Sequence, residues 1–114
     1  MSPIERLTDV LSNFRQYWNP GSSGRGDVHR GLRHLKNLDE DRLNEVSARV
    51  LSRSYENRKV VSAMFKMAED VESLLRLNIT WVERYALARL LISACCYAGI
   101  YRCVTEDASD ERSP

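Results

Sequence analysis

Residues 80–101 read TWVERYALARLLISACCYAGIY and form the most apolar stretch of the chain. When these residues are placed at 100° intervals, apolar side chains lie on every side of the resulting helix. Such a helix must be surrounded, either by other helices of its own chain or by another chain. The first four letters, TWVE, have the pattern of a capping box and predict a helix over about 81–103.

The rest of the chain predicts further helices and no strand. Residues 2–5 (SPIE) form another capping box with proline at the first helical position, which predicts a helix over 4–18. Residues 32–98 contain neither Gly nor Pro. We therefore expect an all-α fold, a small bundle of four to five helices whose last helix is central or at a dimer interface. Caps and apolar spacing place the remaining helices at about 28–37 with Asp27 as N-cap, 40–54 with Asp39 as N-cap, and 57–77.

The length of 114 residues allows one domain with one core. Residues 19–26 (NPGSSGRG) hold three of the five glycines and predict a flexible loop. Residues 105–114 are polar and mainly acidic and predict a disordered tail. The expected organisation is a single helical domain over 1–104, followed by that tail.

The cysteines and the apolar runs predict a cytoplasmic protein. The three cysteines, Cys95, Cys96 and Cys103, are an odd number in one apolar stretch, whereas a secreted disulfide scaffold needs pairs spread between loops. The apolar run 90–101 is too short to span a membrane, and the charged N-terminus does not resemble a signal peptide. Arg makes up 14 of the 17 basic residues, which favours a GC-rich genome and a bacterial or phage source.

The sequence contains no pattern of catalytic or cofactor-binding residues. No serine lies in a nucleophile-elbow context, and no glycine-rich phosphate loop is present. His29 and His34 are five residues apart, which does not place two metal ligands on one helix face, so we expect them to be surface histidines. The cysteines are expected to be buried and unreactive. We therefore predict a protein that is not an enzyme and holds no metal or cofactor.

The segment 25–36 is the most basic part of the chain. It has four basic residues against one acidic residue, although the net charge of the whole chain is only +1. A basic helix face can contact phosphates, but this one lacks stacking aromatic residues and is followed by several acidic residues. A nucleic-acid-binding module is therefore the alternative function. Its candidate phosphate contacts are Arg25, Arg30, Arg33 and Lys36.

The last helix also carries small residues at regular spacing. Ala88, Cys95 and Gly99 fall within a sector of about 40°, which would let a second helix approach closely. The sector fits a self-association seam and a central core helix equally well. Trp81, Tyr97 and Tyr101 are candidate anchors because aromatic residues are enriched at interfaces. The residues predicted for a partner or dimer interface are Trp81, Ala88, Ile92, Cys95, Gly99 and Tyr101.

These observations favour a binding protein over an enzyme. We expect a small regulatory protein that binds and inhibits or remodels a larger protein partner, for example an anti-activator of a transcription regulator or a phage-type inhibitor. Self-association as a homodimer is a companion hypothesis. The sequence does not identify the partner or show which of the two faces, the basic helix or the last helix, binds it.

Overall fold

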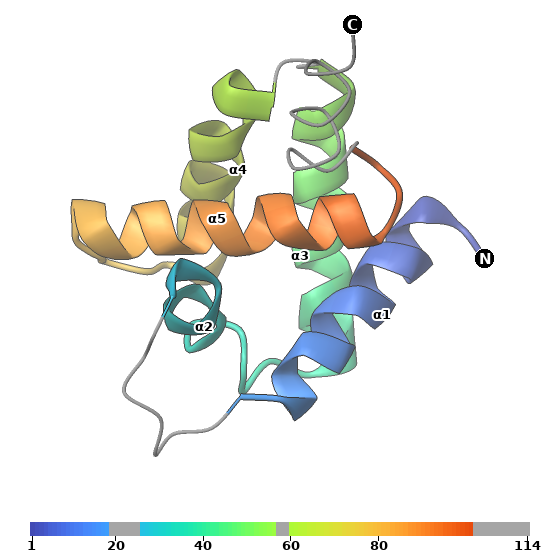
Figure 1. Cartoon of the computed structure of the whole chain (residues 1–114), viewed down its shortest axis with the longest axis horizontal. Coiled ribbons are helices and arrows are strands. Elements are labelled where there is room, and N and C mark those ends of the chain that lie inside the picture. The colour runs from blue at the N-terminus through green and yellow to red at the C-terminus, as the bar shows by residue number, and fades with distance from the viewer. Residues whose placement is uncertain (19–25, 57–59, 102–114) are drawn as a thin grey trace, which may run out of the picture.

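The computed structural model describes residues 1–18, 26–56 and 60–101, and within these ranges the chain is all-helical without strands. This confirms the expected fold class, a small bundle. The described residues share one hydrophobic core. The helices are α1 (Pro3–Gln16), α2 (Asp27–Leu32), α3 (Glu40–Glu56), α4 (Val60–Leu75) and α5 (Trp81–Tyr97) (Figure 1).

Helix α5 is the central helix of the bundle, as its apolar composition predicts. It crosses the molecule between α2 on one side and α4 on the other, and it also contacts α1 (Figure 1). Helix α3 completes the bundle by packing against α1 and α4. The buried residues of α5 are Ala86, Leu87, Ala88, Leu90, Leu91, Ile92, Ala94 and Cys95.

The predicted helix starts at Ser2, Asp39 and Thr80 are confirmed, and the predicted N-cap of α2 is corrected. The capping box at Ser2 is complete, and Asp39 accepts a hydrogen bond from the backbone N–H of Arg42 at 2.8 Å. Thr80 accepts from the backbone N–H of Glu83 at 3.3 Å, but the Glu83 carboxylate contacts His34 instead of completing the box. Asp27 is the first helical residue and not the N-cap of α2, because Gly26 holds the cap position with φ +87°.

Four helices end earlier than the sequence predicts, and α1 is one of them, since it ends at Gln16 and not at residue 18. Helix α5 ends at Tyr97 because Gly99 adopts φ +77°, and the N–H groups of Gly99 and Ile100 donate to the carbonyls of Cys96 and Cys95 at 3.1 and 2.8 Å. This pair of bonds is a Schellman motif, which closes a helix. Helix α4 ends in the same manner, with Arg76 at φ +54°. Beyond Leu32, α2 gives way to tighter turns over residues 33–37.

Gly31 brings α2 against the backbone of α5. A Cβ atom at this position would lie 2.5 Å from the carbonyl oxygen of Ala86 and 3.0 Å from the Cα of Leu87. Both atoms belong to the backbone of α5, which cannot rotate away as a side chain can. The contact between these two helices therefore depends on the missing side chain of Gly31.

Polar contacts fasten the remaining helices to each other. Between α1 and α3, the Thr8 hydroxyl lies 2.7 Å from the Ser47 hydroxyl and donates to Asn44 at 2.9 Å. Two bidentate ion pairs fasten α4, one between Arg53 and Asp70 to α3 and the other between Arg84 and Glu72 to α5. Arg15, in the last turn of α1, donates to the carbonyl oxygens of Leu35, Lys36 and Leu38, which follow α2.

None of the helices within the described ranges is both long enough and apolar enough to cross a lipid bilayer.

Candidate protein-interaction surface

Five residues of α5 at a spacing of four form a row that we call the α5 stripe: Trp81, Tyr85, Arg89, Ser93 and Tyr97. Each step of four residues turns about 40° around the helix, so the row winds from the α4 side of α5 at Trp81 to the α1 side at Tyr97. Successive members are four residues apart and are therefore neighbours on the helix surface. Trp81 and Tyr97, at the two ends, expose 64% and 75% of their surfaces. Arg89, at the midpoint, is exposed, whereas Tyr85 and Ser93 are half-buried. At 1.5 Å per residue, the α5 stripe is about 24 Å long.

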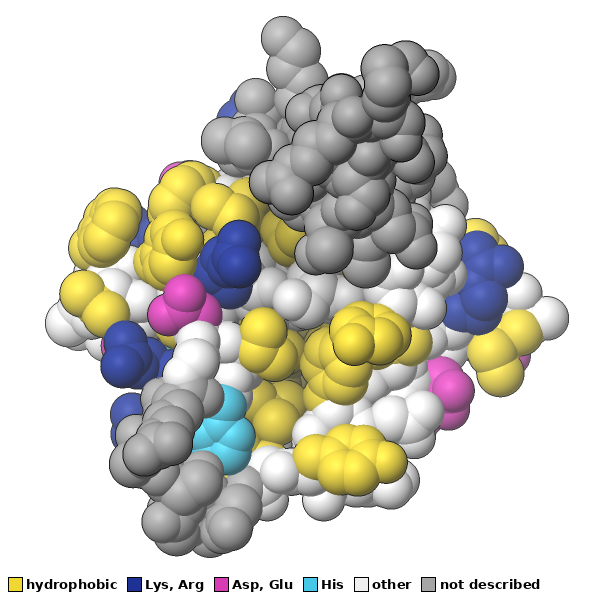
Figure 2. All heavy atoms as spheres, in the orientation of Figure 1, with side chains coloured by type: hydrophobic (Ala, Val, Ile, Leu, Met, Phe, Trp, Pro, Cys, Tyr) yellow, Lys and Arg dark blue, Asp and Glu magenta, His cyan; other side chains and the backbone are white. Residues whose placement is uncertain are grey.

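One end of the α5 stripe belongs to an aromatic cluster formed by Phe65, Trp81 and Tyr85. The ring of Trp81 stacks on Tyr85 and on Phe65 with centroid distances of 5.8 and 6.3 Å, and Phe65 lies 6.1 Å from Tyr85. The Arg84–Glu72 ion pair joins the two helices that supply these rings, and its hydrogen bonds raise the pKa of the Arg84 guanidinium. Figure 2 shows hydrophobic side chains gathered over this part of α4 and α5.

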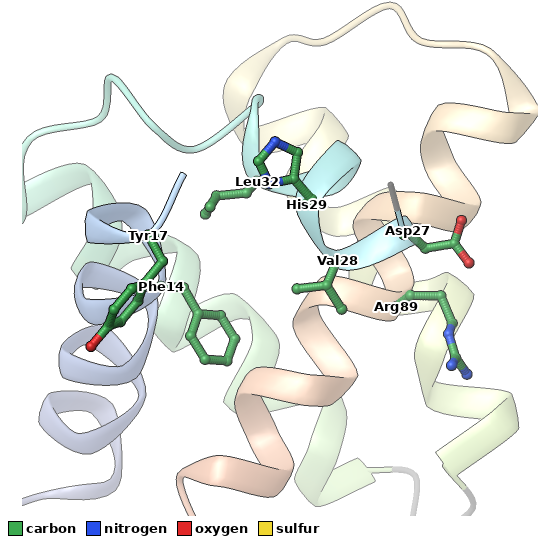
Figure 3. A pocket seen from close by; sticks show the side chains of 8 residues that line it. Phe14, Tyr17, Asp27, Val28, His29, Leu32 and Arg89 are labelled. Atoms are coloured by element: carbon green, nitrogen blue, oxygen red, sulfur yellow. The ribbon is translucent and has the colours of Figure 1, made fainter. Parts of the chain in front are cut away.

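The other part of the α5 stripe borders a groove of about 570 Å³ between α1, α2 and α5. Phe14, Val28 and Leu32 point into the groove from two helices (Figure 3). Tyr97 packs edge-on against Phe14 at 5.5 Å, so the end of the α5 stripe adjoins the groove wall. The groove is lined by Phe14, Tyr17, Gly26, Asp27, Val28, His29, Leu32 and Arg89.

Arg89 connects the two parts of this surface. It belongs to the α5 stripe and also lines the groove, where it lies on the same side as Asp27 (Figure 3). Its guanidinium forms no hydrogen bond or ion pair with any residue in the described part of the chain. The surface therefore consists of two hydrophobic areas with an available cation between them.

The structure places half of the predicted interface residues inside the core. Ala88 and Cys95 are fully buried and Ile92 is 6% exposed. In the sequence, the small residues of α5 are compatible with a self-association seam or with a central core helix. The burial of Ala88 and Cys95 agrees with the second interpretation, a central core helix. A Cβ atom added to Gly99 would meet no other atom within 4 Å, and the role of this glycine is to end α5 and not to admit a second helix.

The two aromatic members of the predicted interface have different surroundings. Trp81 is exposed and lies at one end of the α5 stripe. Tyr101 is half-buried against the core, and this burial raises the pKa of its hydroxyl to about 12. Of the two aromatic residues in the predicted set, only Trp81 is therefore freely presented to a partner.

Burial also determines the chemistry of the cysteines. It raises the pKa of the Cys95 thiol to about 12, so this thiol stays protonated and is a poor nucleophile at neutral pH, in line with the expectation from the sequence. Cys96 is half-buried, and Cys103 lies outside the described residues.

The predicted phosphate contacts do not form one free basic face. Arg30 is half-buried, and the Arg33 side chain is 61% exposed but lies 3.9 Å from the Glu83 carboxylate. The Lys36 ammonium lies over the Trp18 ring, 3.9 Å from its centroid. Arg25, like most of the predicted loop 19–26 and all of the tail 105–114, lies outside the described residues.

The two histidines are not the simple surface residues that the sequence predicts. His34 has a side chain that is only 14% exposed and contacts the Glu83 carboxylate at 2.9 Å, which links the turns after α2 to the first turn of α5. The His29 ring stacks on Trp18 at a centroid distance of 6.0 Å. The sequence predicts that the basic segment lacks a stacking aromatic residue. The structure supplies one from outside the segment, because Trp18, which follows α1, stacks on His29.

Within the described part of the chain, no group of three or more His, Cys, Asp or Glu residues is arranged to hold a metal ion. Comparisons of the chain with protein-family models, with curated proteins and with solved structures find no significant match.

Several residues of this surface are not predicted from the sequence. Phe65, Tyr85 and Arg89 are not among the predicted interface residues, although the spacing of four that joins 81, 85, 89, 93 and 97 is present in the sequence. That spacing is hidden because α5 has apolar residues on every side, so no single face stands out. The spacing of apolar residues in α1 assigns Phe14 to a core stripe, and the groove that it lines depends on how three helices meet.

Proposed function

We propose that this protein is a non-enzymatic regulatory protein that binds a larger protein partner and inhibits or remodels it. The observation that supports this most directly is the composition of the α5 stripe. Trp, Tyr and Arg are the residue types that dominate the binding energy of protein interfaces. Here two exposed aromatic residues, a half-buried tyrosine and an exposed arginine lie in one row on the central helix.

The state of these side chains before binding also suits an interface. Trp81, Tyr85 and Phe65 already stack on one another, so a partner would not have to order three free rings. Side chains that are held in place lose less conformational entropy on association. The groove beside Arg89 adds a concave site for an apolar side chain of the partner.

Self-association as a homodimer belongs to the same proposal as an alternative use of this surface. Ala88, Ile92 and Cys95 are buried in the core, so a dimer would have to form through the exposed side of α5 instead. For the compartment, we propose the cytoplasm, on the basis of the odd number of cysteines and the protonated state of Cys95. The Arg-rich composition favours a bacterial or phage source.

The experiment that tests this proposal is an affinity purification from native lysate with and without nuclease. The bait would be the wild-type chain, a Trp81→Ala/Tyr97→Ala variant, and an Arg49→Ala control that changes an exposed residue of α3. We expect one protein to be recovered in near-stoichiometric amount after nuclease treatment, to be lost with the double variant and to be kept with the control.

Two results would contradict the proposal. One is a partner that the double variant retains as well as the wild type does, which would place binding elsewhere. The other is recovery of nucleic acid without a stoichiometric protein, lost at moderate salt and after Arg30→Glu/Arg33→Glu. That result would favour the alternative, a nucleic-acid-binding module.

A further inference from the structure

We infer that the partner binds the α5 stripe with an amphipathic helix that has an acidic side chain between two bulky apolar ones. This inference rests on the proposed function and adds the chemistry of the partner to it. Three observations support it: the order of features along α5, the charge of Arg89, which has no partner among the described residues, and the charge that a second copy would place against Arg89.

The order of features along α5 determines the spacing of groups on the partner. The aromatic cluster lies at one end, Arg89 follows and lines the groove, and Tyr97 lies beyond it against Phe14. Packed helices have axes about 8–10 Å apart and contact each other with residues three or four positions apart. Apolar residues seven positions apart on a helix are about 10 Å apart, which reaches from Tyr85, the cluster member next to Arg89, to the groove that Arg89 lines. The residue between them would reach Arg89.

The charge of Arg89 determines the chemistry of that middle residue. Covering an arginine with apolar groups alone removes its water without replacing the lost hydrogen bonds, which is costly. A carboxylate can accept two parallel hydrogen bonds from a guanidinium and offsets that cost. Asp27 also lines the groove, but it is the first residue of α2, where a carboxylate interacts favourably with the helix N-terminus.

A second copy of the chain fits this surface less well. Arg89 is the midpoint of the α5 stripe, eight residues from Trp81 and eight from Tyr97. An antiparallel, twofold-symmetric contact between two such stripes places each Arg89 against the Arg89 of the other copy. Like charges in contact at the centre of an interface oppose association. An acidic helix of another protein avoids this repulsion.

The test uses two synthetic helical peptides of 16 residues as probes. Each has two leucines seven residues apart, with glutamate between them in one peptide and lysine in the other. Binding to the wild-type chain, to Arg89→Glu and to the control Arg49→Glu is measured by calorimetry, and backbone amide shifts locate the site. We expect the wild type and the control to bind the glutamate peptide about tenfold more tightly than the lysine peptide. Arg89→Glu should reverse this preference.

Three outcomes would overturn the inference. The first is equal affinity for both peptides or no binding by either at about 1 mM. The second is amide shifts outside α5 and the groove. The third is a wild-type dimer, detected by sedimentation, that Trp81→Ala dissociates, because a second copy would then occupy the α5 stripe. The first two outcomes overturn this inference and not the proposed function. The proposed function is contradicted by a different result, a partner from lysate that the Trp81→Ala/Tyr97→Ala variant still binds.

Discussion

Replacing Gly31 by alanine tests the close approach of α2 to the backbone of α5. The added Cβ would lie 2.5 Å from the Ala86 oxygen and 2.9 Å from the Ala86 carbonyl carbon, whereas ordinary contacts between heavy atoms are about 3.5–4.0 Å. Helices α2 and α5 would have to separate by about 1 Å to accept the methyl group. Such a separation would loosen the packing of Leu32 and Leu87, which are both buried.

The size of the effect is the difference between two terms. Adding a methyl group to a well-packed site typically costs about 1–3 kcal/mol, and we expect the upper part of this range because the obstructing atoms are backbone. Alanine is favoured over glycine within a helix by up to about 1 kcal/mol, which opposes that cost. The net expectation is a loss of about 2 kcal/mol in the free energy of unfolding, a factor of roughly 30 in the folding equilibrium.

The assay is urea unfolding followed by circular dichroism at equilibrium. With an m-value of about 2 kcal/mol/M, a loss of this size lowers the midpoint by about 1 M urea. Ser52→Ala, at an exposed position of α3, is the control because it raises helix propensity without a crowded neighbour. If Gly31→Ala unfolds at the same urea concentration as the wild type or at a higher one, α2 does not pack this closely on α5 and the reasoning is refuted.

Three further changes probe other parts of the fold. Ser2→Ala removes the capping box of α1 and should lower the free energy of unfolding by about 1 kcal/mol in the same urea assay. Thr8→Val removes the hydroxyl that contacts both Ser47 and Asn44, but Ser47 can still donate to the Leu43 carbonyl at 3.0 Å, so the loss should be about 1 kcal/mol. A loss below about 0.5 kcal/mol would show that water replaces the hydroxyl. For Cys95, the folded chain keeps its thiol protonated up to a pKa of about 12, whereas the unfolded chain ionises near the ordinary value of 9.0. The free energy of unfolding should therefore fall as the pH rises from 9.0 to about 12, and it should fall less in Cys95→Ala. In a separate assay, mass spectrometry should find Cys95 alkylated by iodoacetamide at pH 8 only after unfolding.

The sequence predicts the helices well because the signals for them are local. Caps such as Ser2 and Asp39 and the spacing of apolar residues depend only on residues a few positions apart. The helix ends are predicted less accurately. The sequence stretch after Leu90 stays apolar beyond Tyr97, and its apolar character conceals the helix-ending role of Gly99.

The candidate surface can be predicted only in part, because it depends on contacts between distant segments. Trp81 is identified by residue type alone. Phe65 joins it only because α4 lies beside α5, and Glu83 leaves its expected cap to contact His34 only because α2 lies against the start of α5. The burial of Ala88 and Cys95 depends equally on where the other helices pack. The spacing of residues along one sequence does not show which side chains of different helices come into contact.

The central position of α5 has a consequence for synthesis on the ribosome. The helix that the others surround is translated after them, since it follows α1 to α4 in the chain. At about 5–20 residues per second, roughly 3–13 s separate translation of the end of α2 from that of the end of α5. During this interval the side chain of Leu32 lacks the helix against which α2 mainly packs, so the nascent chain exposes apolar surface that the folded protein buries. Completion of the fold is therefore a late event that follows translation of Tyr97.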